Sequence, residues 1–378
     1  MNILFITHYP HLYGSIRSVI DLADGLEALG VNSFFIIPEE GDFSQWLQEH
    51  HKSYSILPVP RWVSVEPCNL RQKVRLLGEI TRSTRLIRDW IDTWNIDIVY
   101  TNTSVTPVGR MVARSARLPH IWHIREFGDL DFSLRYILPK WLCRWFIRTS
   151  TAIICNSEAV RHYYFNNKPY NHVHVIYNGI ATRSQFDTYR EKASSLTTNP
   201  VYTFLIIGSL SAKKGQNTAL RALAELRQRG IRARLLVAGS GRESSRVNLL
   251  TLAAELGITG DVEFLGYISD PYEAYFKSDC LLMCSEHEAF GRVSAEAMSA
   301  CLPVIGRNSG GNPEVIEDGK TGFLYNTFDE LVDYMEKLVQ DPQLSRRMGL
   351  AGWQRAKEKF NIEEYAANVY QVIQSVMK

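Results

Sequence analysis

The sequence predicts an α/β protein built from two doubly wound domains, and three observations support this fold class. Short apolar runs alternate with helical patterns along the whole chain. Apolar runs that are bounded by turns and separated by helices indicate parallel sheets. The chain has 378 residues, which is long for a single hydrophobic core and sufficient for two.

Apolar runs followed by turn residues mark the expected strands. In the first half of the chain, strands are expected at residues 3–7, 34–37, 96–100, 120–124, 151–155 and 173–177. In the second half, strands are expected at residues 203–207, 234–238, 262–265, 280–284 and 303–305. Open parallel sheets bind ligands at the carboxyl ends of their strands, so two such domains that face each other are expected to form a substrate cleft.

A polar segment, residues 181–200, separates the two halves. It is rich in Ser and Thr, ends in Pro200 and shows no sustained apolar period. We therefore interpret it as the interdomain linker. The first domain is then expected to span residues 1–180, and the second domain residues 201–360.

The chain is expected to end in a helix over residues 361–378. Asn361, followed three residues later by Glu364, is a start signal of the capping-box type. One face of this helix is apolar and consists of Tyr365, Val369, Val372, Ile373 and Val376. A terminal helix with such a face must pack against one of the domains.

Composition and charge argue against several classes of protein. With 45% hydrophobic and 22% charged residues, the chain resembles an ordinary globular protein. Its net charge of +2 does not indicate a nucleic-acid partner. No apolar run approaches the ~18 residues of a membrane span, and because residues 3–7 already read as a strand we expect no signal peptide. The six cysteines form no C-x-x-C pair, so a reducing cytoplasm is the expected compartment.

The most informative motif places two carboxylates around a helix start. Glu288 follows the apolar run at residues 280–284, and Glu296 lies one turn into the next expected helix. The segment between them contains Phe290, Gly291, Arg292 and Val293. Backbone N–H groups at a helix start can hold an anion, while carboxylates accept hydrogen bonds from paired hydroxyls. A nucleotide sugar carries hydroxyls on both sides of a diphosphate, so the motif predicts glycosyl transfer.

A second motif follows the strand at residues 203–207. It contains Gly208, Ser209, Lys213, Lys214 and Gly215. Lys214 could place its ammonium against a diphosphate and stabilise the charge on a departing nucleotide. Gly215 would let the chain turn tightly beside it. Further on, Gly310 and Gly311 either permit close approach to a ligand or form a structural turn.

The first half contributes two candidate positions. Gly14 and Ser15 begin a helix after the strand at residues 3–7 and could contact the diphosphate. His123 ends the strand at residues 120–124, and this position favours an active-site role over a core role. Asp129 and Asp131 resemble a metal-binding D-x-D pair, but no His or Cys cluster supports them, so no metal site is expected.

The first half is also basic. Residues 61–148 carry 15 Lys and Arg against 8 Asp and Glu, which indicates either a solvated helical surface or a surface for an acidic partner. Within this region, residues 139–148 form an amphipathic stretch. Its basic face contains Lys140, Arg144 and Arg148, and its apolar face contains Trp141, Leu142, Trp145 and Phe146. This helix could lie on an anionic membrane or pack its aromatic face into the core.

Together these motifs resemble glycosyltransferase family 4, a retaining family with the two-domain GT-B architecture. The most specific part of the resemblance is the pair Glu288 and Glu296, with seven residues between them. Residues 178–180 and 319–323 also resemble family segments. The resemblance implies two facing Rossmann-like domains with an interdomain cleft, a last helix that packs on the first domain, and no metal or cofactor.

The resemblance also implies roles for individual residues. Glu288 would contact the hydroxyls of the donor sugar, and Glu296 the ribose hydroxyls of the nucleotide. Lys214 would contact the distal phosphate, His123 would lie beside the transferred sugar, and Gly14 beside the diphosphate.

Two positions depart from the pattern of the family. Ser209 stands where the family often has an arginine, and Lys213 or Arg292 could supply that charge. Tyr13 precedes Gly14, where the family often has two adjacent glycines.

We therefore expect a metal-independent, retaining hexosyltransferase of polysaccharide biosynthesis. It would move a hexose or N-acetylhexosamine from a nucleoside-diphosphate sugar to a hydroxyl of a growing or lipid-linked glycan, without a nucleic-acid partner. Peripheral contact with the inner face of the membrane would go through the basic first domain. The alternatives are a nucleotide-sugar epimerase of the same architecture and a non-catalytic subunit of a glycan-assembly complex.

Overall fold

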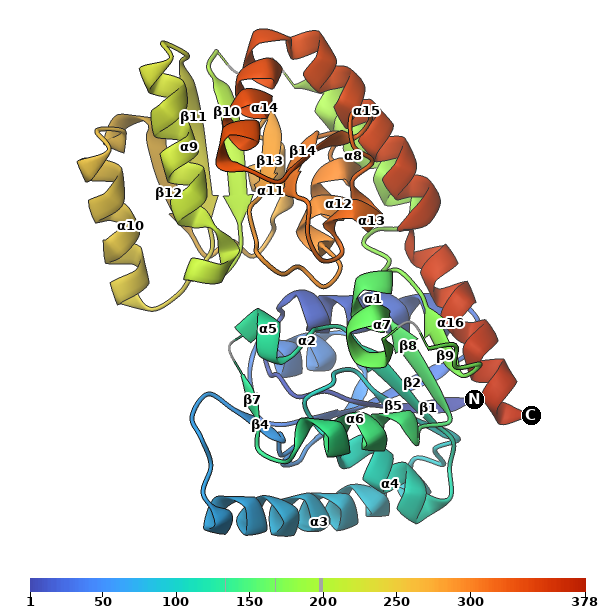
Figure 1. Ribbon diagram of the computed structural model, residues 1–378. Coiled ribbons are helices and arrows are strands. Elements are labelled where there is room, and N and C mark those ends of the chain that lie inside the picture. Colours follow the sequence, from blue (N-terminus) through green and yellow to red (C-terminus); the bar gives the residue numbers. More distant parts are fainter. Residues whose placement is uncertain (133, 167, 197–199) are drawn as a thin grey trace. The chain divides into compact units, whose positions relative to one another are not determined.

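The computed structural model describes residues 1–132, 134–166, 168–196 and 200–378, and it divides into two compact units (Figure 1). The first unit comprises Met1–Gly179 together with Ile362–Lys378, and the second comprises Ile180–Asn361. Each unit is an α/β domain whose main sheet is parallel. The predicted fold class is therefore confirmed, and each predicted apolar run contains a strand.

The first unit holds a parallel sheet in the order β3-β2-β1-β5-β6-β8-β9. Its strands are β1 (Asn2–Ile6), β2 (Asn32–Ile37), β3 (Ser53–Ile56), β5 (Ile98–Thr101), β6 (His120–Ile124), β8 (Ala152–Cys155) and β9 (Val173–Val175). The edge strand β3 was not predicted, because its polar, half-exposed sequence lacks an apolar run. The same holds for the short antiparallel ribbon of β4 (Val63–Ser64) and β7 (Arg135–Tyr136).

Both faces of this sheet are covered. Ile3 and Phe5 of β1 belong to one apolar cluster, while Leu4 and Ile6 belong to another, as the alternation of side chains along a strand requires. The first cluster includes α1 (Gly14–Glu27) and α2 (Asp42–Glu49), and the second includes α3 (Leu70–Thr93) and α4 (Val108–Ala116). The remaining helices are α5 (Asp129–Phe132), α6 (Lys140–Arg148) and α7 (Glu158–Phe165).

The terminal helix α16 (Ile362–Met377) packs on the first unit, as predicted. Tyr365, Val369 and Ile373 lie in the same apolar cluster as α1. A Cβ atom at Gly25 of α1 would come within 2.6 Å of the Ala366 Cβ. The absence of a side chain at that position therefore lets the two helices approach each other closely.

The second unit holds a parallel sheet in the order β12-β11-β10-β13-β14-β15. Its strands are β10 (Tyr202–Ile207), β11 (Ala233–Ala238), β12 (Val262–Gly266), β13 (Cys280–Met283), β14 (Val304–Arg307) and β15 (Gly322–Tyr325). Its helical segments after β10 are η1 (Ala212–Lys214), α9 (Gln216–Gln228), α10 (Glu243–Glu255), η2 (Thr259–Asp261), α11 (Tyr272–Tyr275), α12 (Arg292–Ser299), α13 (Asn312–Val315), α14 (Phe328–Gln340) and α15 (Pro342–Lys359).

The segment interpreted as a linker, residues 181–200, is largely helical instead. It contains α8 (Arg183–Ser195), which starts with a capping box between Thr182 and Gln185. Phe186 is fully buried, and its carbonyl accepts a hydrogen bond from the Trp353 indole of α15, 2.8 Å away. One buried aromatic residue anchors this helix, so the sequence shows no apolar period there. Residues 197–199 lie outside the described residues.

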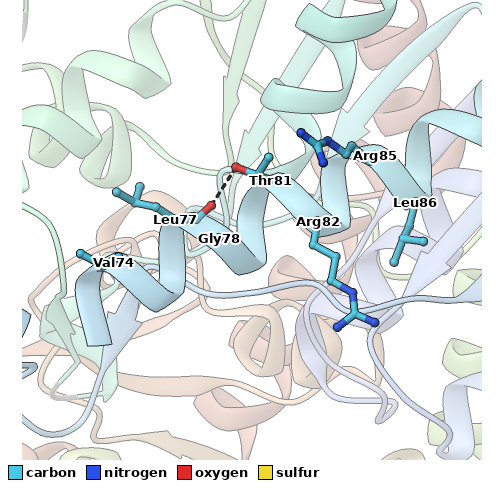
Figure 2. Close-up of a pocket in the computed structure, with 7 residues that line it drawn as sticks. All are labelled: Val74, Leu77, Gly78, Thr81, Arg82, Arg85 and Leu86. Atoms are coloured by element: carbon cyan, nitrogen blue, oxygen red, sulfur yellow. Dashed lines mark hydrogen bonds between the residues drawn. The ribbon is translucent and has the colours of Figure 1, made fainter. Parts of the chain in front are cut away.

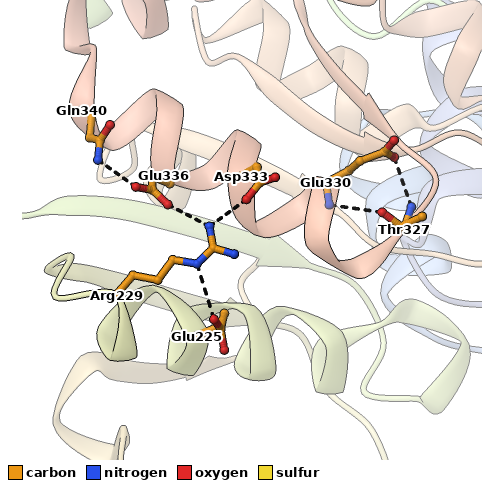
Figure 3. A network of polar contacts seen from close by, with 7 residues as sticks. All are labelled: Glu225, Arg229, Thr327, Glu330, Asp333, Glu336 and Gln340. Carbon is orange, nitrogen blue, oxygen red and sulfur yellow. Dashed lines mark hydrogen bonds and ion pairs between the residues drawn. The ribbon is translucent and has the colours of Figure 1, made fainter.

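Figure 3 shows a polar network that joins the end of α9 to α14 in the second unit. Arg229 Nη1 lies 2.7 Å from Asp333 Oδ1 and 2.8 Å from Glu336 Oε2. At the start of α14, Thr327 and Glu330 form a capping box. These contacts fix two neighbouring helices on one side of the sheet.

Within the described ranges, no helix is both long enough and apolar enough to cross a membrane.

Candidate functional site

The predicted residues of the second unit lie in loops at the carboxyl ends of adjacent strands. β10 and β13 pair with each other, and β14 pairs with β13. The turn with Lys214 follows β10, the loop with Glu288 follows β13, and the glycine loop at residues 309–311 follows β14. Because parallel strands end at the same edge of a sheet, these three loops meet there.

Lys214 and Glu288 form an ion pair at this edge. Lys214 Nζ lies 2.9 Å from Glu288 Oε2, and the two side chains keep 31% and 17% of their exposure. The sequence placed these residues in separate motifs, and the structure brings their charged atoms into direct contact. From this position the Lys214 ammonium could rotate from the Glu288 carboxylate to a phosphate beside it by a small movement of its side chain.

A glycine accounts for the position of Lys214. Gly215 has φ of +77°, and a Cβ atom there would come within 2.4 Å of the Cys284 carbonyl oxygen at the end of β13. Only glycine allows this turn to lie directly against the strand. The backbone of Lys213 joins the same contact, because its carbonyl accepts a hydrogen bond from the Glu286 N–H, 3.2 Å away.

Two further glycines support Glu288. The Gly311 N–H donates to the Glu288 carbonyl at 2.7 Å. Gly310 has φ of +57°, and a Cβ atom there would come within 2.3 Å of the same carbonyl oxygen. The paired glycines therefore let the β14 loop close onto the backbone that carries the carboxylate. The close approach is therefore to the protein's own backbone, which is the structural turn of the two alternatives predicted for these glycines.

Glu296 is buried on α12 and has donors on both carboxylate oxygens. Arg292 Nε lies 2.6 Å from Glu296 Oε1, and the Tyr275 hydroxyl donates to Oε2 at 3.0 Å. Burial raises the pKa of Tyr275 well above its ordinary value, and the nearby Glu296 carboxylate adds to the effect, so the phenol stays a donor. Arg292, one candidate to replace the family arginine at the exposed Ser209, donates to Glu296 here.

Two buried polar atoms near the start of α12 have no hydrogen-bond partner among the described residues. Gly291 begins the helix with φ of +89°, and Phe290 before it packs edge-on against Phe360 at 5.4 Å between ring centroids. Close to Gly291, the buried atoms Ser294 Oγ and Asn312 Oδ1 lack a hydrogen-bond partner among the residues that the structure describes. Buried polar atoms are normally satisfied, so these two are suited to a water molecule or a ligand hydroxyl. Sequence reasoning did not single them out.

His123 ends β6 in the first unit and is fully buried. Its Nδ1 lies 2.6 Å from the Tyr100 hydroxyl, whereas Nε2 has no hydrogen-bond partner in the described part of the chain. Burial, with a smaller contribution from Arg125, lowers the pKa of His123 well below its ordinary value, so the ring is neutral. A Tyr100 hydroxyl that donates to Nδ1 leaves the ring proton on Nε2, which could then donate to a hydroxyl.

A buried arginine beside His123 was missed by sequence reasoning. Arg125 donates from Nε to Asn102 Oδ1 at 2.5 Å, from Nη2 to the Tyr365 hydroxyl at 2.7 Å, and from Nη1 to Asn178 Oδ1. These acceptors are uncharged and come from three segments that are distant in the sequence. The available sequence signal was weak. Arg125 and Asn102 each directly follow a strand, and Asn178 lies in the segment at residues 178–180.

Gly14 and Ser15 begin α1 at the same edge of the sheet. Ser15 contributes its carbonyl, which accepts a hydrogen bond from Asn102 Nδ2 at 3.0 Å, and Gly14 is exposed. The start of α1 is thereby linked through Asn102 to Arg125. The structure places the first-unit candidates together at the carboxyl ends of β1, β5 and β6.

Of the D-x-D pair, the structure describes the side-chain contacts of Asp129 alone. Asp129 pairs with Lys140 at 2.8 Å and accepts from the Tyr163 hydroxyl, while the side chain of Asp131 is outside the described part. No group of three or more His, Cys, Asp or Glu residues in the described ranges could hold a metal ion.

Comparison with family models relates both units to glycosyltransferases. A model described as Glycosyltransferase Family 4 matches residues 13–184, and one described as Glycosyl transferases group 1 matches residues 187–355.

Several curated proteins are similar in sequence. The putative glycosyltransferase EpsD of Bacillus subtilis (strain 168) is 28% identical over 303 residues, which cover 75% of this chain and 78% of that protein. The N-acetyl-alpha-D-glucosaminyl L-malate synthase of Bacillus anthracis is 31% identical over 216 residues, or 56% of each protein. The human alpha-1,3/1,6-mannosyltransferase ALG2 is 29% identical over 300 residues, covering 72% of this chain and 71% of that protein.

Solved structures share the fold over nearly the whole chain. Anabaena Alr3699/HepE, in complex with UDP and glucose, superposes with a TM-score of 0.79 and covers 99% of both chains at 21% identity. A glycosyltransferase from Rickettsia africae ESF-5 reaches a TM-score of 0.81, at 19% identity, over 100% of this chain and 98% of its own.

Proposed function

Because this chain belongs to glycosyltransferase family 4 and has the GT-B fold, we propose that it is a retaining hexosyltransferase that uses a nucleoside-diphosphate sugar. It would transfer a hexose or N-acetylhexosamine to a hydroxyl of a growing or lipid-linked glycan. The observation that carries the proposal is the contact of Lys214 Nζ with Glu288 Oε2 at 2.9 Å. This contact brings together, at one sheet edge, an ammonium that would bind a phosphate and a carboxylate that would bind sugar hydroxyls.

Lys214 and Glu288 would divide the work on the donor. The Lys214 ammonium would stabilise the negative charge that develops on the departing diphosphate. One well-placed donor of this kind changes kcat by about 10²–10³. The Glu288 carboxylate would accept hydrogen bonds from the sugar hydroxyls and fix the orientation of the ring. The proposed reaction draws its positive charge from Lys214 and uses neither a metal ion nor a cofactor.

Glu296 would bind the ribose of the nucleotide. Arg292 and the Tyr275 hydroxyl each occupy one lone pair of its carboxylate and hold it in a single orientation. Each oxygen keeps another lone pair, so two adjacent ribose hydroxyls could still donate to it. Preorganisation of this kind lowers the entropy cost of binding the donor.

Retention of the anomeric configuration would proceed without a covalent enzyme intermediate. The bond from the anomeric carbon to the acceptor oxygen would form on the face from which the phosphate oxygen departs. The acceptor proton would pass to that phosphate oxygen, and Lys214 would stabilise the resulting diphosphate. The neutral ring of His123 would contact a hydroxyl of the transferred sugar through Nε2, with Tyr100 fixing its orientation.

The first test is a thermal-shift screen with UDP, GDP, ADP and their common sugar conjugates in the presence of EDTA. Binding at a hundredfold excess over Kd would stabilise the protein by about 2.7 kcal/mol. We expect one base to stabilise the native protein and not a Glu296→Ala variant. NMR of the product formed with that donor should show a retained anomeric configuration, and an inverted product or a trapped glycosyl ester would refute the mechanism.

The same assay separates the alternatives. An isomeric nucleotide sugar that forms without any acceptor would identify an epimerase. Donor binding that survives in the Glu288→Ala variant, with no turnover by either protein, would identify a non-catalytic subunit.

A further inference from the structure

The helix α3 (Leu70–Thr93) carries a second apolar stripe that faces away from the protein. Leu76, Ile80 and Ile87 are buried on its inner side. The outer stripe contains Leu70, Val74, Leu77 and Thr81, with exposed fractions of 75%, 62% and 51% for the first three. These four positions are separated by three or four residues, so they lie on one face of a helix. The Thr81 hydroxyl donates to the Leu77 carbonyl at 2.9 Å, which leaves its methyl group as the outward part (Figure 2).

A shallow groove runs along this stripe. It is lined by Val74, Leu77, Gly78, Thr81, Arg82, Arg85 and Leu86 (Figure 2). A Cβ atom at Gly78 would meet nothing within 4 Å, so packing within the described chain does not require a glycine there. Glycine is also a poorer helix former than alanine. The groove is therefore a surface feature that internal packing does not explain.

Arginines flank the stripe on one side. Arg71, Arg82 and Arg85 are exposed, and none of them has an ion pair among the described residues. Glu79 is the only acidic residue between positions 70 and 88, and it pairs with Arg75 at 2.7 Å. The stripe therefore has a basic margin, and no ion pair within the described ranges neutralises the charge of these three arginines.

The helix α6 (Lys140–Arg148) adds two exposed indoles. Trp141 and Trp145 keep 70% and 55% of their exposure. The guanidinium of Arg144 instead lies 4.8 Å from the centre of the Tyr163 ring, and that of Arg148 lies near Phe165 and Tyr170. The sequence left open whether the aromatic face of this helix lies on a membrane or packs into the core. For Trp141 and Trp145, packing into the core is wrong. The arginines of this helix are held against α7 and the loop after it, and the indoles point outward.

Both helices belong to the same side of the first unit. Each follows one strand of the β4–β7 ribbon, in which Val63 pairs with Tyr136. Phe146 of α6 packs on Trp122, whose neighbour Ile121 lies in the cluster of α1 and α16. Successive residues of a strand point to opposite faces, so Trp122 and α6 lie on the face that α3 covers.

We propose that these residues form a surface that docks on an anionic lipid bilayer. This α3–α6 surface consists of Leu70, Arg71, Val74, Leu77, Thr81, Arg82, Arg85, Trp141 and Trp145. Aliphatic side chains and indoles would enter the boundary between headgroups and acyl chains, where tryptophan is enriched. The unpaired arginines match the charge of acidic headgroups, and each contributes roughly fivefold to the partition coefficient. An acidic protein partner would also match the charge of the arginines. It would not account for the exposed aliphatic side chains of α3 and the exposed indoles of α6 beside them.

The proposal goes beyond the transfer reaction and can fail independently of it. It would keep the first unit at the interface where the hydroxyl of a lipid-linked acceptor is located. The residues proposed to bind the donor, among them Lys214, Glu288, Glu296 and His123, are not part of this surface, so a failure of membrane docking would leave the proposed transfer reaction intact.

Sedimentation of the full chain with vesicles tests the proposal. Vesicles of phosphatidylcholine alone are compared with vesicles that also contain phosphatidylglycerol. We expect binding to the anionic vesicles, with a shift of tryptophan emission to shorter wavelength. An Arg82→Gln/Arg85→Gln variant should partition about 25-fold more weakly, because two arginines are neutralised. A Val74→Ser/Leu77→Ser variant should also lose binding while it unfolds at the same temperature as the native protein.

Matched controls lie in the second unit. Arg232→Gln/Arg242→Gln removes the same charge from exposed positions, and Val247→Ser alters a side chain with 48% exposure. Neither should change vesicle binding. Equal binding to neutral and anionic vesicles, or equal losses in the controls, would overturn the proposal. So would absence of vesicle binding together with a dimer in solution that Val74→Ser/Leu77→Ser disrupts, because the surface would then be an interface between two copies of the chain.

Discussion

Replacing Lys214 by methionine should separate stability from activity. In the free protein, the Lys214 ammonium and the Glu288 carboxylate lie 2.9 Å apart and both remain partly exposed. Their attraction alone is about 6 kcal/mol at an effective dielectric constant of about 20. Desolvation and the ordering of two side chains offset most of it, so pairs of this kind contribute about 0–1 kcal/mol to the free energy of unfolding.

The effect on transfer should be much larger. If Lys214 stabilises the charge that appears on the departing diphosphate, its loss should lower kcat by about 10²–10³, which corresponds to roughly 3–4 kcal/mol. The assay measures nucleotide release at saturating donor and acceptor, alongside urea unfolding of the same preparations. Lys213→Met is the comparison variant. It removes the adjacent positive charge from the same short helix, and Lys213 is itself a candidate for the charge missing at Ser209, so a smaller loss of kcat is expected for it than for Lys214→Met.

Two results would refute this reasoning. A kcat for Lys214→Met within tenfold of the native value would show that the ammonium does not act on the transition state. A large drop in the free energy of unfolding, accompanied by a proportional loss of active protein, would show that Lys214 serves mainly to hold the Glu288 loop. An equal loss of kcat in Lys213→Met would mean that the general positive charge, and not the contact at 2.9 Å, is what matters.

Three further outcomes are expected. Tyr275→Phe removes a donor from the buried carboxylate of Glu296, so isothermal titration should show weaker nucleotide binding by about 1–3 kcal/mol, with little change in kcat. Gly310→Ala places a methyl group against the Glu288 carbonyl at a left-handed backbone position. It should lower the free energy of unfolding in urea by about 1–2 kcal/mol and also lower the activity. Gly260→Ala, at a position with open space around it, should change neither. The first unit should also lose stability in acid. Burial lowers the pKa of three of its histidines, His8, His120 and His123, to about 3 for His8. The unfolded chain takes up these protons below about pH 6.5, so each histidine should reduce the free energy of unfolding by about 1.4 kcal/mol per pH unit below that point. Urea unfolding at pH 7 and pH 5 tests this, and equal stabilities at the two values would contradict it.

Local patterns in the sequence were sufficient to select the charged residues that we propose for the site of the second unit. Glu288 and Glu296 lie on either side of a helix start, and Lys214 follows a buried strand, so their spacing alone indicated an anion and hydroxyl site. Their meeting point also followed from topology, because parallel strands end at one edge of a sheet. Apolar runs likewise located the strands of the two main sheets, except β3 and β15 (Gly322–Tyr325). The strand β15 was not predicted, although its Phe323 and Tyr325 are buried.

Two elements had no local signal of this kind. The helix α8 rests on a capping box and one buried side chain, Phe186, so it lacks the apolar period by which helices are found. Its supporting hydrogen bond comes from Trp353, 167 residues later in the chain. The strand β3 lies at the edge of the sheet and is half-exposed, so its sequence is polar, and it is defined by its pairing with β2. In both cases the decisive contact is with another segment of the chain.

The cluster around Arg125 shows the same limit. Its partners Asn102, Asn178 and Tyr365 are separated from it by as many as 240 residues, and each is ordinary in its own segment. A buried guanidinium needs acceptors on all sides, and only the folded sheet and the terminal helix bring these three together.

The class of fold, most of the strands with buried faces and the charged groups proposed for the second-unit site follow from the sequence alone. They depend on apolar periodicity and on residue types at short spacing, which are local properties. The pairing of Lys214 with Glu288, the burial of Arg125 among neutral acceptors and the outward orientation of Trp141 and Trp145 emerge only in the folded chain. Each of these depends on which surfaces remain after distant segments have packed, and the amphipathic pattern of one helix cannot specify that.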